Sequence, residues 1–243
     1  HHHVHVSGKT YANVELGDVL KALAEKLGKR SWERISVGSV GSPEGSGNQP
    51  ITAQALYPRW AQFLRNDDIV VAETGTASMG LGFALMPRGA QFHNQTLWGS
   101  IGWATPAAVG AAIAAPNRRV VLVTGEGSHQ LTAQEIGQFG RLGLKPVILV
   151  LNNNGYLIER LLCTNPAIMY NDVAPWRYTE LPHAFGCDDW LSVRVTDCGE
   201  FDAALEQAQH ADRGVYIEVV TETYVTSPLA QRLHESMGSL YRS

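Results

Sequence analysis

Residues 125–159 read GEGSHQLTAQEIGQFGRLGLKPVILVLNNNGYLIE, and this stretch decides the fold. Gly125-Glu126-Gly127 closes an apolar run, an amphipathic segment of helix length follows, and a second apolar run ends in three asparagines. This order is that of a βαβ unit, whose two strands run parallel. We therefore expect Glu126 and the asparagines to meet at the carboxyl edge of a sheet, where open α/β sheets bind ligands.

The residue types at this edge indicate a metal-bound phosphate. A carboxylate, an amide and backbone carbonyls are hard oxygen ligands that suit Mg²⁺. Ser128, at the start of the expected helix, is placed to offer an N–H or hydroxyl to an anion. A glycine-flanked acid alone would more often be a tight turn, but the asparagines after the second strand favour a site. The spacing matches neither GxGxxG nor GxxxxGK[ST], which removes the main support for a dinucleotide site or a P-loop.

The chain around this unit alternates apolar strands with amphipathic helices. We expect strands over 69–73, 120–124, 147–151, 191–195 and 215–220, and helices over 52–64, 106–115, 131–142, 200–210 and after Pro228. Such alternation predicts an α/β fold: a doubly wound parallel sheet with helices on both faces.

Composition divides the chain into three parts. Residues 1–37 contain a strand and an amphipathic helix and are expected to be the tail of a preceding domain. Residues 38–50, GSVGSPEGSGNQP, are expected to be a linker, because they offer almost nothing to bury. Residues 51–243 are expected to form the ligand-binding domain. The initial His1-His2-His3 has no methionine before it, and fits a tag remnant or the start of a fragment.

Composition also excludes several classes of function. The net charge of −4 and the absence of a basic cluster argue against nucleic-acid binding. The apolar runs are too short to span a bilayer, which predicts a soluble chain without a membrane partner. Three cysteines without CxxC spacing fit a reducing compartment, and we expect the protein in the cytoplasm.

The 125–159 stretch resembles the diphosphate-binding motif of thiamine-diphosphate enzymes, in which GDG precedes a spacer and NN. Other runs strengthen the resemblance: AETGT at 72–76, WGSIGW at 98–103, QLTAQE at 130–135, NNNGYLIE at 152–159 and YND at 170–172. Together they are similar to the 2-oxo acid decarboxylases of the pyruvate and indolepyruvate decarboxylase group. The resemblance covers residue 51 to the end, and more weakly the first 30 residues, which look like the end of that family's middle domain.

The resemblance implies thiamine diphosphate and Mg²⁺ as cofactors. Glu126, the Asn153 side chain and the Gly155 carbonyl would bind the metal. The carbonyl of Gly99 would hold the cofactor's exocyclic amine, and Ile101 would wedge beneath its two rings. The remaining cofactor-binding positions would be Thr74, Gly125, Gly127, Ser128, Asn153 and Tyr156.

The same resemblance implies non-oxidative decarboxylation of a 2-oxo acid to an aldehyde and CO₂. Glu159 would face the substrate and assist proton transfer and loss of CO₂. Ile158 suits a short substrate such as pyruvate, whereas the small residues at 77–78 and Met79, where relatives carry aromatic residues, leave room for larger groups. The substrate pocket is thus expected to include Ile158, Ser78 and Met79.

Two departures from the family pattern matter. Glu126 stands where the family has aspartate, and its extra methylene must be accommodated around an octahedral ion. The family's N-terminal domain, which holds the cofactor's pyrimidine end, is not recognisable in this chain. We therefore expect activity only with that domain, supplied by a longer polypeptide, which we favour, or by a partner subunit, in a homodimer or homotetramer. A carboligase of the acetolactate-synthase type and a non-catalytic assembly subunit remain alternatives.

Overall fold

The structure is a computed structural model that describes residues 2–27, 39–95 and 97–240, and it divides into two units, His1–Val37 and Gly38–Ser243. In the first unit, β1 (His3–Val6) and β2 (Lys9–Ala12) form an antiparallel hairpin that precedes α1 (Leu16–Leu27). Ser7 and Gly8 connect the strands with φ of 49° and 78°, as two-residue hairpin turns require. None of residues 2–27 is buried.

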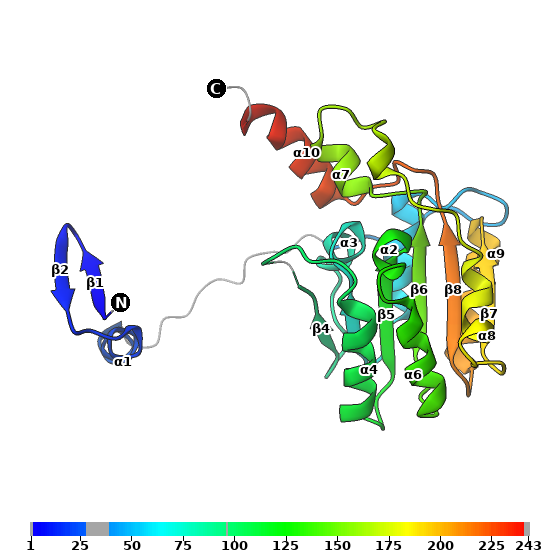
Figure 1. Ribbon diagram of the computed structural model, residues 1–243, viewed down its shortest axis with the longest axis horizontal. Coiled ribbons are helices and arrows are strands. Elements are labelled where there is room, and N and C mark those ends of the chain that lie inside the picture. Colours follow the sequence, from blue (N-terminus) through cyan, green and yellow to red (C-terminus); the bar gives the residue numbers. More distant parts are fainter. Residues whose placement is uncertain (1, 28–38, 96, 241–243) are drawn as a thin grey trace. The chain divides into compact units, whose positions relative to one another are not determined.

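The second unit is built on six parallel strands in the order β4-β3-β5-β6-β8-β7 (Figure 1). Their bounds are β3 (Ile69–Ala72), β4 (Gln91–His93), β5 (Val120–Gly125), β6 (Val147–Asn152), β7 (Leu191–Val195) and β8 (Val215–Val220). The central strands are rich in valine, isoleucine and leucine because both of their faces are covered. The chain runs from β3 to β4 on one side and then returns to β5 on the other, so the topological switch point lies between β3 and β5.

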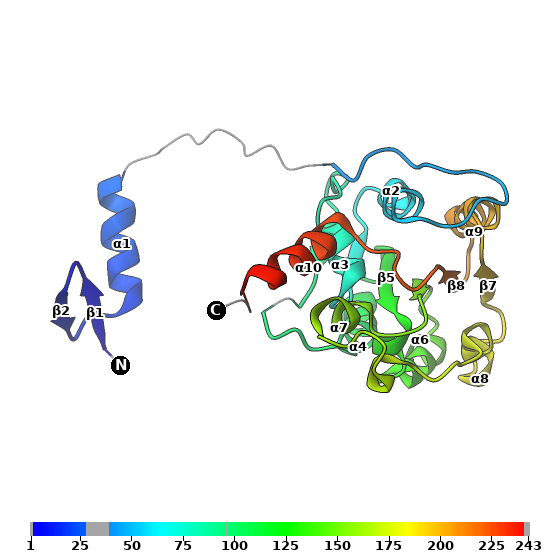
Figure 2. The same cartoon turned by 90° about the horizontal axis from the view of Figure 1, so that it is seen from above.

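Helices cover both faces of this sheet (Figure 2). One layer contains α2 (Ala53–Phe63), α3 (Thr76–Leu81) and α9 (Cys198–His210), and the other contains α4 (Ala104–Ala114), α6 (Ile136–Arg141) and α8 (Leu181–Ala184). Alternate residues of β5 enter opposite cores: Val121 and Val123 face the first layer, Val120 and Leu122 the second. The predicted doubly wound parallel sheet is confirmed.

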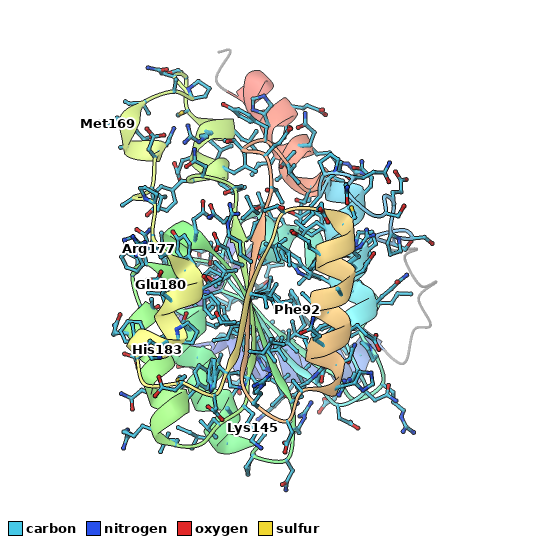
Figure 3. The ribbon with its side chains drawn as sticks, turned by 90° about the vertical axis from the view of Figure 1, so that its right-hand side faces the viewer. Phe92, Lys145, Met169, Arg177, Glu180 and His183 are labelled. Carbon is cyan, nitrogen blue, oxygen red and sulfur yellow. The ribbon has the colours of Figure 1, made fainter. Side chains whose placement is uncertain are left out.

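The carboxyl edge of the sheet carries additional elements. They are α5 (Glu126–His129), α7 (Leu157–Leu162), α10 (Pro228–Leu240), and the 3₁₀ turns η1 (Ala133–Glu135) and η2 (Met169–Asn171). The turn η3 (Tyr178–Glu180) lies beside the start of β7, where the Ser192 hydroxyl donates to the carbonyl of Thr179. Leu157, Leu161 and Ala230 form a small core of their own between α7 and α10. Figure 3 shows Met169 beyond this edge, whereas Lys145 lies at the opposite one.

The structure differs from the sequence-based expectation at several elements. The single helix expected over 131–142 is wrong: helix forms directly at Glu126, stops at His129 and resumes only after Thr132, whose φ of −142° is not helical. The short elements β4 and α3 were not predicted.

The segment before α2, which the sequence suggests is a linker, makes hydrogen bonds to the rest of the second unit. Within the expected linker, the carbonyls of Glu44 and Gly45 accept hydrogen bonds from Arg59, and the carbonyl of Gln49 accepts one from the N–H of Cys198.

Among the helices in the described part of the chain, none has the length and apolarity needed to cross a membrane.

Candidate functional site

A cavity of about 520 Å³ opens at the carboxyl ends of β3, β5 and β6. Every residue that the sequence assigns to the site lines it. These residues are Thr74, Ser78, Met79, Gly99, Ile101, Gly125, Glu126, Gly127, Ser128, Asn153, Gly155, Tyr156, Ile158 and Glu159. The fold thus brings together four segments separated in sequence, which follow β3, precede α4, follow β5 and follow β6. The individual roles of their residues stay predictions.

Glu126 is the buried carboxylate at the bottom of the site. It is 3% exposed, and its Oε1 accepts a hydrogen bond of 2.7 Å from the N–H of Gly155. Burial raises the pKa of Glu126 to about 7, although backbone N–H groups, that of Gly155 foremost, act in the opposite direction. A cation beside this carboxylate would favour its charged form.

Asn153 completes a set of oxygen donors around Glu126. One terminal atom of its side chain lies 3.2 Å from Glu126 Oε1 and 2.9 Å from the carbonyl oxygen of Gly155. With nitrogen at that position, Asn153 donates to both oxygens. Nitrogen is the orientation that satisfies these contacts. Turning the amide over would instead bring the Asn153 oxygen next to the carboxylate and the carbonyl, and such a set of oxygens suits a cation. The donor set therefore fits Mg²⁺, with one carboxylate, one amide and one carbonyl.

The loop of residues 153–155, which carries two of these candidate ligands, has a constrained backbone. Asn154 has φ of 62° and Gly155 has φ of 135°. A Cβ on Gly155 would lie 2.4 Å from the carbonyl oxygen of Asn171 and 2.6 Å from the guanidinium of Arg160. Only glycine fits this position, because both its dihedral angle and the available space exclude a side chain.

A second close approach joins the loops after β5 and β6. A Cβ on Gly127 would lie 2.4 Å from the ring of Tyr156, and the hydroxyl of Tyr156 lies 3.5 Å from the Gly127 carbonyl. Ser128 is buried in the same turn. The absence of a side chain at Gly127 thus permits the close contact between these two loops.

The loop before α4 forms another wall of the cavity. It contributes Gly99 and the partly exposed Ile101. The Thr74 hydroxyl lies 2.7 Å from the carbonyl oxygen of Gln95 and 2.8 Å from that of Ser100, so in this structure it fixes the loop.

Glu159 and Ile158 lie on the first turn of α7. Glu159 is exposed at the cavity, whereas Ile158 packs with Met79 against the small core between α7 and α10. Ser78 is buried at the start of α3, where its hydroxyl donates to the carbonyl of Gly75.

Several residues around the cavity were not predicted. Tyr170, Leu162 and Leu233 also line it. Arg160 is buried beside the loop of residues 153–155, where it lies 3.1 Å from the carbonyl oxygen of Asn154, and it lies 2.7 Å from the carboxylate of Asp172. The YND run was noticed, but no pattern indicated that Arg160 would bind it. Among the described residues, at this site or elsewhere, no group of three or more His, Cys, Asp or Glu side chains is placed to hold a metal ion, so a metal here would also need amide and carbonyl oxygens.

Comparison with known proteins identifies the family. Residues 67–219 match the model described as thiamine pyrophosphate enzyme, C-terminal TPP binding domain. Similar curated proteins include the alpha-keto-acid decarboxylase of Mycobacterium avium strain 104, 43% identical over 88% of this chain and 39% of that protein. The protein of the same name from Mycobacterium ulcerans strain Agy99 is 40% identical over 97% of this chain and 42% of its own length. The chain thus spans about two fifths of these relatives.

Solved structures show the same fold. The thiamine diphosphate-dependent 4-hydroxybenzoylformate decarboxylase of Rhodococcus jostii RHA1 aligns with a TM-score of 0.66 and 24% identity, over 86% of this chain and 40% of that one. Benzoylformate decarboxylase from Polynucleobacter necessarius aligns with a TM-score of 0.62 and 21% identity, over 71% and 33%. The sequence match, the parallel sheet and the site at its carboxyl edge agree, and the chain belongs to the thiamine pyrophosphate enzymes, with the C-terminal TPP-binding domain of that family.

Proposed function

We propose that this chain supplies the diphosphate- and metal-binding half of an enzyme that decarboxylates a 2-oxo acid to an aldehyde and CO₂. The observation that carries the proposal is the convergence of Glu126, Asn153 and Gly155 on one point of a cavity that is large enough for a cofactor. Curated relatives named alpha-keto-acid decarboxylases support the same reaction class. When bound, thiamine diphosphate would supply the electron sink for the decarboxylation.

The chain's own residues would bind the metal ion and orient the cofactor and the substrate. Glu126, Asn153 and the Gly155 carbonyl would hold Mg²⁺. Gly99 and Ile101 would orient the cofactor rings, while its diphosphate would lie against the group Thr74, Gly125, Gly127, Ser128 and Tyr156. Glu159, exposed at the cavity, would move a proton to or from the substrate. Ile158, Ser78 and Met79 would set the size of the substrate's side chain.

The reaction also needs a partner domain. Two segments bordering the cavity expose large apolar side chains: Leu97 and Trp98 are 84% and 82% exposed, and Met169 is 82% exposed. Such surface usually marks a contact with another chain or domain. We propose that an N-terminal pyrimidine-binding domain covers it, from the rest of a longer chain or from a second subunit of a homodimer or homotetramer. The three free cysteines suit the cytoplasm.

Calorimetry on the complete protein tests the metal assignment. Thiamine diphosphate should bind in the presence of Mg²⁺ and not in the presence of EDTA. Glu126→Ala should weaken Mg²⁺ binding by at least about tenfold, because one of the three protein ligands is lost. Glu126→Asp should retain metal binding, and Glu206→Gln, an exposed carboxylate on α9, is the matched control.

The products separate the remaining possibilities. An aldehyde and CO₂ from 2-oxo acids support the proposal, whereas acetoin or acetolactate as the main product would favour a carboligase. A complete protein that does not bind thiamine diphosphate at all would instead be a non-catalytic assembly subunit. Metal dependence that is unchanged in both Glu126 variants would refute the ligand assignment.

A further inference from the structure

Glu73 is a fully buried carboxylate outside the cavity lining. It follows β3 directly and is 0% exposed. Its Oε1 accepts a 2.9 Å hydrogen bond from the N–H of Thr74, and its Oε2 accepts bonds of 3.1 Å and 3.3 Å from the N–H groups of Gly102 and Ala104. Throughout the described residues, the hydrogen bonds to this carboxylate come from backbone N–H groups, and no cation pairs with it.

A buried carboxylate without a paired cation lowers the stability of the fold unless other interactions offset its cost. Burial raises the pKa of Glu73, opposed by its three N–H donors. The start of α4 offsets part of the cost, since negative charge is favoured at a helix N-terminus. Moving a carboxylate out of water costs free energy that its hydrogen bonds can only offset, so the burial of Glu73 is weak evidence for a purely stabilising role.

The two groups that bind Glu73 Oε2 lie at the end of the loop before α4 and at the first residue of that helix. This loop carries Gly99 and Ile101, which line the cavity. Gly102 has φ of 81°, and a Cβ there would lie 2.8 Å from the side chain of Leu131, so the loop packs closely. Glu73 therefore connects the end of β3 to the wall of the cavity.

Two hydroxyls hold the same loop by its carbonyls. Thr74 donates to the carbonyl of Ser100, and Thr132 donates to that of Gly102 over 2.8 Å. Glu73 alone among these three side chains binds the N–H groups of the loop. The carboxylate of Glu73 thus binds N–H groups of this segment, and the two hydroxyls bind its carbonyl groups.

We propose that Glu73 is a positioning residue. Its hydrogen bonds hold the loop bearing Gly99 and Ile101 in the position in which these two residues can contact the cofactor. The inference rests on the proposed function, because it presumes that thiamine diphosphate occupies the cavity. Glu73 itself touches neither cofactor nor substrate. Its carboxylate orders the loop before the cofactor arrives, so binding does not have to supply that ordering.

Glu73→Gln is the direct test. Glutamine has one acceptor oxygen, so its NH₂ group must face either Thr74 or the Gly102 and Ala104 donors. In the complete protein with saturating Mg²⁺, we expect the Kd for thiamine diphosphate to rise about tenfold, as for the loss of one buried hydrogen bond to a charged group. Quenching of tryptophan fluorescence measures it, since Trp98 and Trp103 flank the loop. In the cofactor-free protein, the amides of Gly102 and Ala104 should exchange faster.

Asp68→Asn is the matched control. Asp68 is 2% exposed, precedes the other end of β3, and pairs with Arg119 at 2.6 Å. We expect this variant to lower the melting temperature without changing the Kd for thiamine diphosphate. Thr132→Ala, which frees the carbonyl of Gly102, should raise the Kd less than Glu73→Gln does.

The outcomes are distinct. Wild-type protein that does not bind thiamine diphosphate overturns both the proposed function and the role of Glu73. Wild-type binding with an unchanged Kd in Glu73→Gln overturns only the positioning role. A Kd that rises equally in Glu73→Gln and Asp68→Asn also overturns the positioning role, because the rise would then follow from a general loss of stability. If Glu73→Gln does not fold, Thr132→Ala decides: an unchanged Kd and unchanged exchange at Gly102 overturn the inference.

Discussion

At the scale of single residues, His129 makes stability depend on pH. Its ring is 0% exposed, with Nδ1 3.2 Å from the Thr105 hydroxyl and Nε2 without a hydrogen-bond partner in the described structure. Burial lowers the pKa of His129 from 6.5 to about 4. Between these values the unfolded chain binds a proton that the folded chain does not, so the free energy of unfolding falls as the pH falls.

The expected loss between pH 7 and pH 5 is about 2 kcal/mol from this one group. Urea unfolding at a series of pH values measures it. Glu126, whose pKa burial raises to about 7, acts in the opposite direction over this range, so the His129 contribution is read from the difference between two profiles. Relative to His129→Phe, which keeps a ring beside Tyr216, the wild type should lose about 2 kcal/mol between pH 7 and pH 5. His93→Gln, on the exposed side of β4, should show the wild-type profile. Identical profiles for wild type and His129→Phe would contradict the prediction.

The positions of the residues that follow the central strands could be predicted, while their roles stay predictions. Glu126 and Asn153 follow neighbouring parallel strands, and such strands end at one edge whatever packs around them. Glu73 and Arg160 gave no comparable signal, because a charged residue beside an apolar run is usually solvated. Their burial depends on carbonyls and N–H groups supplied by loops far along the chain.

At the scale of elements, Arg160 ties α7 to the segment that follows it. Its guanidinium lies 3.1 Å from the carbonyl oxygen of Asn154, 3.2 Å from that of Pro166 and 2.7 Å from the Asp172 carboxylate. The loop of residues 153–155 and the segment bearing Tyr170 therefore share the buried guanidinium of Arg160. Replacing Arg160 should therefore destabilise both of these segments.

Arg160→Met should lower the free energy of unfolding by about 3 kcal/mol, since it leaves several buried acceptors without donors. Arg160→Lys should recover only part, because an ammonium group cannot reproduce the planar set of donors. Chemical denaturation and hydrogen exchange over 163–172 measure the effect. Arg141→Met is the control, since that exposed side chain bonds only Gln138 in the described structure. Equal losses in Arg141→Met and Arg160→Met would contradict the assigned role.

Elements with strong periodicity were predicted well, and short or interrupted ones were not. The strands β5, β6 and β8 are buried apolar runs, and their limits differ from expectation by a residue at most. The helix expected over 131–142 was wrong because Thr132 leaves helical geometry and donates to Gly102 instead. The three residues of β4 pair with β3 only by tertiary contact, which no local pattern reveals.

At the scale of the whole molecule, the cavity is a product of topology. Loops after β3, β5 and β6 surround it, and their meeting could be predicted because all three strands are parallel. Leu233 of α10 also lines it, although α10 lies far along the chain. That contact depends on how α10 packs on α7, and helical periodicity alone does not determine a packing partner.

The two units should differ sharply in stability. In α1 the side chains of Leu16, Leu20, Leu23 and Leu27 recur at helical spacing, yet each is exposed, and none of residues 2–27 is buried. A unit of 37 residues is below the roughly 40 that usually fold without a disulfide, metal or partner. Hydrogen exchange on this 243-residue chain should therefore show fast exchange in α1 and slow exchange in β5, β6 and β8. Slow exchange in α1 would contradict the prediction. Protection that appears only in the complete protein would instead show that the leucine stripe packs against residues absent from this chain.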